Sequence, residues 1–127
     1  MPPPDSPPLG SRDAAALLDV LLCARLARAY VAGTTWEGFV ADRQCQDAVV
    51  RRLEVLGEAA RRVSAATRAD LPGLPWRQMI GMRNRMIHEY DRVDLAVVWE
   101  TVVRDLPPLI TALEGVVPGP PADADPA

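Results

Sequence analysis

The chain has 127 residues, the size of one domain, and 49% of them are apolar. Its net charge of −3 argues against a general DNA-binding protein, and no run of about 18 apolar residues predicts a transmembrane span. The N-terminus lacks the basic region and apolar run of a secretory signal, so we expect a cytoplasmic protein with no membrane partner.

Both ends of the chain are predicted to be disordered. Residues 1–11 form a proline-rich extension and residues 117–127 a tail rich in proline and alanine, neither of which can bury much apolar surface. Residues 12–116 remain for a single domain. Its two cysteines, Cys23 and Cys45, have no metal-binding spacing, so we expect reduced thiols in or near the core and no metal site.

The first half of the domain has the apolar spacing of helices. A helix is predicted over Asp13–Val31 and is ended by Gly33. Thr34 and Glu37 have the spacing of a capping box, which predicts a short helix over Thr35–Ala41.

The second half continues this pattern. A long helix is predicted over about Arg43–Ser64, with one apolar stripe formed by Val49, Leu53, Leu56, Ala60 and Val63. After a break at residues 71–75, in which Pro75 suits a first helical position, another helix is expected over about Trp76–Ile87. The last begins at Asp94 as N-cap and should be kinked at Pro107 and Pro108. The sequence therefore predicts an all-α, antiparallel bundle of four to five helices.

Positive charge is concentrated in the middle of the chain. Residues 51–92 carry nine arginines against five acidic residues, whereas the segments on either side are acidic. This zone either holds a phosphate-bearing ligand or consists of solvated helix faces, and charge alone does not separate the two.

Candidate chemistry gathers in residues 83–90, Arg-Asn-Arg-Met-Ile-His-Glu-Tyr. His88 is the single histidine, and an imidazole suits proton transfer near neutral pH. Arg83 offers a planar guanidinium for phosphate oxygens, so the two could cleave RNA without a metal ion. The alternatives are a histidine that only packs or faces solvent and an arginine that makes a salt bridge.

The helical period limits how these side chains can meet. On one straight helix Arg83 and Tyr90 are about 20° apart around the axis, but Arg83 and His88 are about 140° apart. Arg83 and His88 therefore converge only if the helix loosens near residues 86–88, or if two subunits bring these helices face to face.

The spacing Arg, four residues, His, one residue, Tyr resembles the signature of the HEPN superfamily, and the chain is most similar to HepT-type toxins over about residues 12–115. The matching segments are Arg52-Leu53-Glu54, Leu56-Gly57-Glu58-Ala59-Ala60, Leu74-Pro75-Trp76-Arg77, Gly81-Met82-Arg83-Asn84, His88-x-Tyr90, Val93-Asp94 and Val98-Trp99.

This resemblance implies a HEPN-type bundle that forms a homodimer with the signature residues in a shared cleft. It implies a metal-independent endoribonuclease and toxin of a type VII-like toxin–antitoxin system, with Arg83 and His88 catalytic and Asn84 supporting them. The implied partners are RNA and a minimal nucleotidyltransferase antitoxin, which would use ATP to transfer AMP onto Tyr90. The toxin itself needs no cofactor. Otherwise Tyr90 is a packing aromatic residue.

A second function remains open for this sequence. The bundle could be a non-catalytic, nucleotide-binding partner of a nucleotidyltransferase, its basic cleft holding the nucleotide. The intact set of Arg83, His88 and Tyr90 favours the ribonuclease.

Overall fold

The computed structural model describes residues 10–88 and 92–117 of the chain. Within these residues the fold is all-α, as predicted, and an isolated bridge between Ile87 and Val93 is its sole β pairing. The elements in chain order are α1 (Ser11–Val31), α2 (Trp36–Ala41), α3 (Arg43–Arg62), α4 (Ala65–Asp70), α5 (Trp76–Ile80), α6 (Met82–Met86), α7 (Leu95–Glu100), the π-helical η2 (Thr101–Asp105) and α8 (Leu106–Glu114). Most of the two predicted disordered ends lies outside the described residues.

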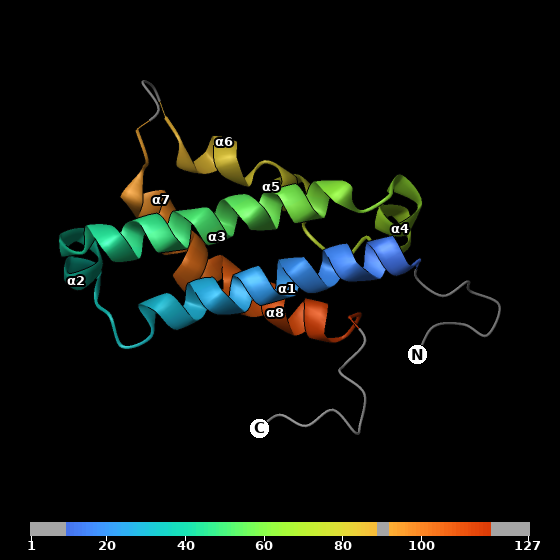
Figure 1. The fold of residues 1–127 in the computed structure, drawn as a ribbon, viewed down its shortest axis with the longest axis horizontal. Helices are drawn as coiled ribbons and strands as arrows, with labels where there is room; N and C mark the ends of the chain where they lie inside the picture. Colours follow the sequence, from blue (N-terminus) through green and yellow to red (C-terminus); the bar gives the residue numbers. More distant parts are fainter. Residues whose placement is uncertain (1–9, 89–91, 118–127) are drawn as a thin grey trace.

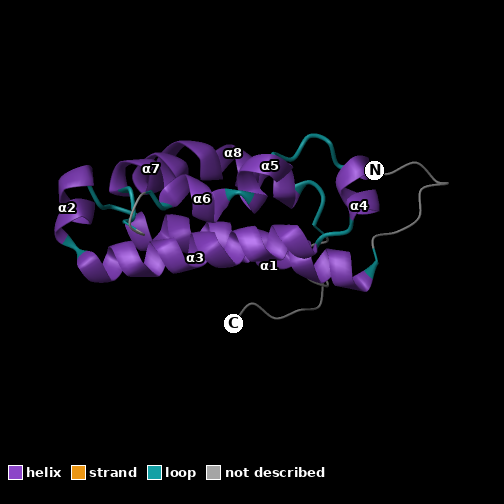
Figure 2. Cartoon of the chain, turned by 90° about the horizontal axis from the view of Figure 1, so that it is seen from above, coloured by secondary structure: helices purple, strands orange, loops and turns teal. Residues whose placement is uncertain are grey.

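Two long antiparallel helices, α1 and α3, form one side of the molecule (Figure 1). The shorter helices α5 to α8 cover their other side, with α2 and α4 at opposite ends (Figure 2). The stripe predicted for α3 is confirmed, since all five of its residues, 49, 53, 56, 60 and 63, are buried. The core lies between the two layers and includes Leu17, Leu53, Met86 and Leu106. No helix in the described part of the chain is long and apolar enough to cross a membrane.

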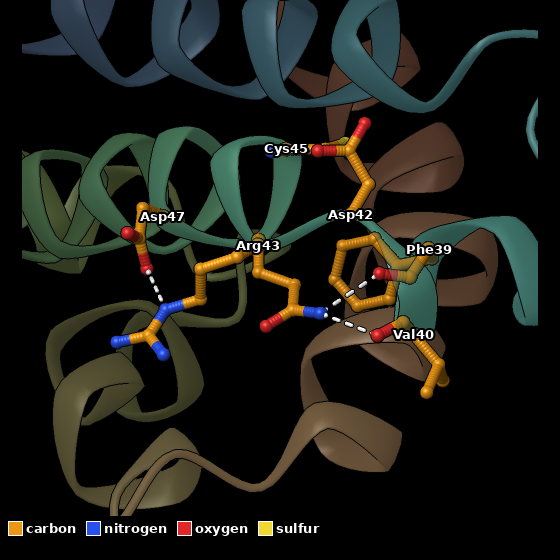
Figure 3. A network of polar contacts seen from close by, with 7 residues as sticks. Phe39, Val40, Asp42, Arg43, Cys45 and Asp47 are labelled. Carbon is orange, nitrogen blue, oxygen red and sulfur yellow. Dashed lines mark hydrogen bonds and ion pairs between the residues drawn. The ribbon is translucent and has the colours of Figure 1, made fainter.

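The junctions around α2 are fixed by side-chain caps. Gly33 has a φ of 75° and follows α1, as expected for the residue that ends that helix. The predicted capping box at Thr34 is wrong by one residue, because the hydroxyl of Thr35 accepts the N–H of Gly38 at 3.0 Å. Asp42 caps α3 by accepting the N–H of Cys45 at 3.0 Å. Hydrogen bonds beside this cap join the start of α3 to α2 (Figure 3).

The short helix α4 has no counterpart among the predicted elements. Ser64 caps it by accepting the N–H of Thr67 at 3.3 Å, and Asp13 of α1 binds both residues. The Asp13 carboxylate accepts the Ser64 N–H at 3.0 Å, the Ser64 hydroxyl at 2.6 Å and the Thr67 hydroxyl. These donors, the Ser64 hydroxyl foremost, lower the pKa of Asp13.

We expect Asp13→Asn to lower the midpoint of thermal unfolding at neutral pH. The difference in midpoint between the variant and wild type should become smaller in acid. A carboxylate with a lowered pKa stabilises the fold fully above the ordinary carboxyl pKa of about 4, and this contribution is lost as the pH falls through the lowered value. Thermal melts of both proteins between pH 7 and about pH 2.5 measure the difference. Asp19→Asn, which removes an exposed ion pair with Arg62, is the control and should change the midpoint less. An equal difference at both ends of the pH range would contradict this expectation.

The last predicted helix is interrupted as expected, but by a widened turn. Asp94 is its N-cap, accepting the N–H of Val97 at 3.2 Å. The interruption is η2, which directly precedes Pro107 and Pro108 in the first turn of α8. Two successive prolines donate no backbone hydrogen bond, and their rings clash with carbonyls four residues earlier, so a π-helical turn here relieves both problems.

Candidate functional site

Helices α5 and α6 approach α3 closely at Gly57, and α6 carries the first of the signature residues. A Cβ atom at residue 57 would lie 2.9 Å from the backbone oxygen of Met79 and 3.5 Å from the Cβ of Met82. The helix predicted over residues 76–87 is divided at Gly81 into α5 and α6. Met79, Met82 and Met86 are buried against the bundle, so the arginines of α6 face outward.

His88 lies beyond the end of α6 rather than on it. The helix ends at Met86, and the backbone of Ile87 is extended, with φ −108° and ψ 121°. The chain then turns back, because the N–H of His88 donates to the oxygen of Arg92 at 2.8 Å and the N–H of Asp94 donates to the oxygen of Met86 at 2.7 Å. Ile87 and Val93 pair between these bonds. The 140° separation expected on a straight helix therefore does not apply to His88, because the helix ends two residues before it.

The imidazole of His88 is held by a carboxylate and remains exposed. Its Nε2 lies 2.8 Å from Oδ2 of Asp94, whose Oδ1 accepts the N–H of Val97. The side chain of His88 is 58% exposed and that of Asp94 is 30% exposed. The Val97 N–H is the main cause that lowers the pKa of Asp94, and His88 contributes to it. Asp94 is therefore an ionised acceptor near neutral pH.

Arg83 and Asn84 lie on the exposed side of α6. Among the described residues, the side chains of Arg83 and Asn84 make no hydrogen bond or ion pair. No such contact joins Arg83 to His88 there. Arg85 is engaged differently, since its guanidinium lies 3.5 Å from the carboxylate of Asp105. The structure thus places Arg83, Asn84 and His88 on one unit, α6 and the turn that follows it, with Arg83 exposed. Tyr90 lies outside the described residues.

The groove nearest to this unit does not contain its reactive groups. It has a volume of about 330 Å³ and lies where α5 and α6 face α8. Its wall includes Met79, Met82, Leu106 and the Arg85–Asp105 pair. Arg83 and His88 are not among its lining residues. In the described part of one chain these two side chains therefore lie on an open surface.

Comparison with known proteins identifies the family of the chain. A family model described as ribonuclease HepT-like matches residues 20–116, which include Arg83, His88 and Asp94. The chain belongs to the HepT-like ribonuclease family. It is 37% identical over 93 residues to "Probable ribonuclease HepT" of Thermococcus cleftensis, covering 73% of this chain and 84% of that protein.

Further relatives carry ribonuclease names as well. A provisionally named RNase of Methanocaldococcus jannaschii is 32% identical over 107 residues, which cover 84% of this chain and 98% of the relative. Another, from Caldanaerobacter subterraneus, is 38% identical over 79 residues, which cover 62% of this chain and 70% of the relative. No solved structure matches. These findings support ribonuclease activity of the HEPN type at the level of the family.

In this member of the HepT-like ribonuclease family, Asp94 is the neighbour of His88 that sequence reasoning missed. The sequence predicted it as an N-cap, which the structure confirms, but gave it no part beside His88. A carboxylate at the start of a helix, six residues after the single histidine, is the signal that could have found it.

Across residues 10–88 and 92–117, no three histidine, cysteine or carboxylate side chains are placed to hold an ion together. Cys23 is buried and Cys45 is half-buried, and both are free thiols, as predicted. Burial raises the pKa of both thiols, which makes them poor nucleophiles.

Proposed function

We propose that this HepT-like ribonuclease is a metal-independent endoribonuclease, acting in the cytoplasm as the toxin half of a toxin–antitoxin pair, with Arg83 and His88 as its catalytic residues. The observation that carries the proposal is the exposed imidazole of His88, held by Asp94 on the same unit as an exposed Arg83. An imidazole and a guanidinium supply the proton transfer and charge stabilisation that RNA cleavage requires.

The reaction uses the ribose 2′-hydroxyl as its nucleophile. A neutral His88 accepts the hydroxyl proton while the 2′-oxygen forms a bond to the adjacent phosphorus. Arg83 stabilises the negative charge that builds on the phosphorane oxygens, and Asn84 helps to orient the phosphate. The bond from phosphorus to the 5′-oxygen then breaks, and that oxygen receives a proton. The products are a 2′,3′-cyclic phosphate and a 5′-hydroxyl.

A homodimer suits this reaction. One chain contains one histidine, whereas the two proton transfers call for a base and an acid. Two chains with their α6 units facing would supply both, and would enclose side chains that lie on an open surface in the described part of one chain. Sedimentation of the pure protein at the mass of a single chain would contradict the dimer.

The test of the proposed activity is cleavage of single-stranded RNA by the purified protein in excess EDTA. We expect internal cuts whose upstream fragments end in a 2′,3′-cyclic phosphate. Cleavage that appears only after a divalent metal is added would contradict the metal-independent reaction. Binding of ATP or AMP with no cleavage at all would favour the non-catalytic nucleotide-binding partner instead.

The proposal extends to control by a partner nucleotidyltransferase. The Tyr90 phenol would attack the α-phosphorus of ATP, lose its proton and release pyrophosphate, leaving AMP on its oxygen. Two observations support it: Tyr90 follows His88 by two residues, and Arg83, whose positive charge could bind an added phosphate, is exposed. The attached AMP would then compete with RNA for the same positive charge.

Tyr90→Phe should remain toxic when expressed alone and should escape neutralisation by the partner. Phenylalanine keeps the ring but lacks the oxygen that accepts AMP. Growth of co-expressing cells and intact-protein mass spectrometry measure the two effects. Tyr30→Phe, which changes the other tyrosine, on α1, is the matched control and should be neutralised like wild type. A neutralised Tyr90→Phe variant would refute the assigned acceptor.

A further inference from the structure

We propose that Asp94 is a positioning residue that holds the proton of the neutral His88 imidazole on Nε2, so that Nδ1 is the atom that exchanges protons with RNA. This inference rests on the proposed ribonuclease function and deepens it. Its physical basis is the 2.8 Å contact between Nε2 of His88 and Oδ2 of Asp94, made by an imidazole side chain that is still 58% exposed.

The direction of the hydrogen bond follows from the charge of Asp94. An ionised carboxylate can only accept, so Nε2 must donate. The lowered pKa of Asp94 keeps it ionised near neutral pH. A neutral imidazole carries one ring proton, and with that proton on Nε2 the lone pair is left on Nδ1. A base has to present a lone pair, which makes Nδ1 the reacting atom.

The backbone around Asp94 prevents the carboxylate from turning away. Oδ1 is engaged by the N–H of Val97 at the start of α7, so Oδ2 remains for His88. The chain segments that carry the two side chains are joined by the bonds from His88 to Arg92 and from Asp94 to Met86. The helix cap and the turn therefore fix both partners of the contact.

The same contact assists the proton transfer. When Nδ1 takes the proton of the 2′-hydroxyl, the ring becomes an imidazolium that donates from both nitrogens. Its positive charge then faces the negative charge of Asp94, which stabilises it. In its other role, an imidazolium gives the Nδ1 proton to the departing 5′-oxygen and returns to the tautomer that Asp94 favours.

Asp94→Asn separates this role from helix capping. The amide oxygen can accept the Val97 N–H as the carboxylate does, whereas the amide nitrogen cannot. The cap therefore turns the NH₂ group toward His88, where it donates to Nε2 and moves the ring proton to Nδ1. The variant keeps the cap and reverses the tautomer.

The ¹⁵N spectrum of the imidazole at alkaline pH, where the ring is neutral, reports the tautomer directly. His88 is the single histidine, so its signals need no assignment. We expect the proton on Nε2 in wild type and on Nδ1 in Asp94→Asn, and a loss of about 100-fold or more in kcat for RNA cleavage. KM should change by less than about threefold, because the phosphate contact of Arg83 is retained.

Asp42→Asn is the matched control, since Asp42 is also an aspartate N-cap and accepts from Cys45 without contacting His88. It should change neither the tautomer nor kcat. Asp94→Ser, which keeps a capping oxygen but is too short to reach His88, should give a mixture of tautomers and serves if Asp94→Asn does not fold.

An Nδ1–H tautomer in wild type, an unchanged tautomer in Asp94→Asn, or an equal loss of kcat in Asp42→Asn would each overturn the inference. The proposed function fails separately. If wild type does not cleave RNA but the tautomer reverses as described, the ribonuclease proposal falls while the assignment of the His88 proton stands.

Discussion

Replacing His88 or Arg83 by alanine should reduce RNA cleavage by about 100- to 1,000-fold and abolish growth arrest in cells that lack the partner. The two losses have different causes. His88→Ala removes the group that takes the proton of the 2′-hydroxyl, and Asp94 is left with an uncompensated charge at the surface. Arg83→Ala removes a permanent positive charge from the phosphorane oxygens, and such a donor has its largest effect where the second subunit of the proposed dimer excludes water.

Arg85→Ala is the control for both variants. Arg85 lies on the same helix, two residues after Arg83, and is exposed, but it is paired with Asp105. Losing an exposed ion pair lowers stability by at most about 1 kcal/mol, which leaves the domain folded. Arg85 has no proposed contact with RNA, so cleavage should fall by less than about tenfold. Initial rates at saturating RNA and melting curves of all four proteins are the required measurements. Wild-type rates in folded His88→Ala would end the catalytic assignment, because no second histidine can replace it.

The regular parts of this fold could be predicted from the sequence because their apolar spacing reflects burial directly. Residues 49, 53, 56 and 60 of α3 recur at intervals of four and three, and each is fully buried. The C-terminal end of α1 and the start of α7 were predictable too, since Gly33 and Asp94 have local chemistry that ends or begins a helix.

The geometry of the site could not be predicted in the same way. Nothing in the residues from Arg83 to His88 breaks a helix, so the pattern favoured a helix as far as Ile87. The helix ends at Met86 because the chain gains pairing between residues six to eight positions apart, from Ile87 to Val93 and from Asp94 back to Met86. The contact of His88 with Asp94 results from this turn. A helical period contains no information about it, which is why Asp94 was predicted only as a cap.

The position of α5 and α6 on the bundle also depends on packing. α3 presents Gly57 where the backbone of α5 crosses it, and only a residue without a side chain allows this approach. From the sequence, Gly57 is an unfavourable residue inside a good helix. In the structure it sets how closely α5 and α6 approach α3, and therefore where Arg83 lies on the bundle.

Gly57→Ala should therefore lower stability by about 1–3 kcal/mol, although alanine favours a helix by about 1 kcal/mol over glycine. The new Cβ would lie 2.9 Å from the backbone oxygen of Met79, which is closer than van der Waals contact allows. Because that oxygen belongs to the backbone, it cannot move aside without the helix. The overlap is relieved by lifting α5 and α6 off α3. In a domain of this size the loss corresponds to a fall of about 5–15 °C in the thermal midpoint.

The displacement should also reach the reaction, because α6 carries Arg83 and leads into the turn that holds His88. A shift of about 1 Å in a catalytic group can cost as much as 100-fold, so we expect cleavage to fall by about tenfold at temperatures where the variant is fully folded. Gly38→Ala is the matched control. Its Cβ would meet only side-chain atoms of Thr34 and Thr35, at 3.3 and 3.4 Å, and these can adjust. It should keep wild-type cleavage and lose little or no stability. If Gly57→Ala were as stable and active as Gly38→Ala, the close approach of α5 to α3 would not be what positions Arg83.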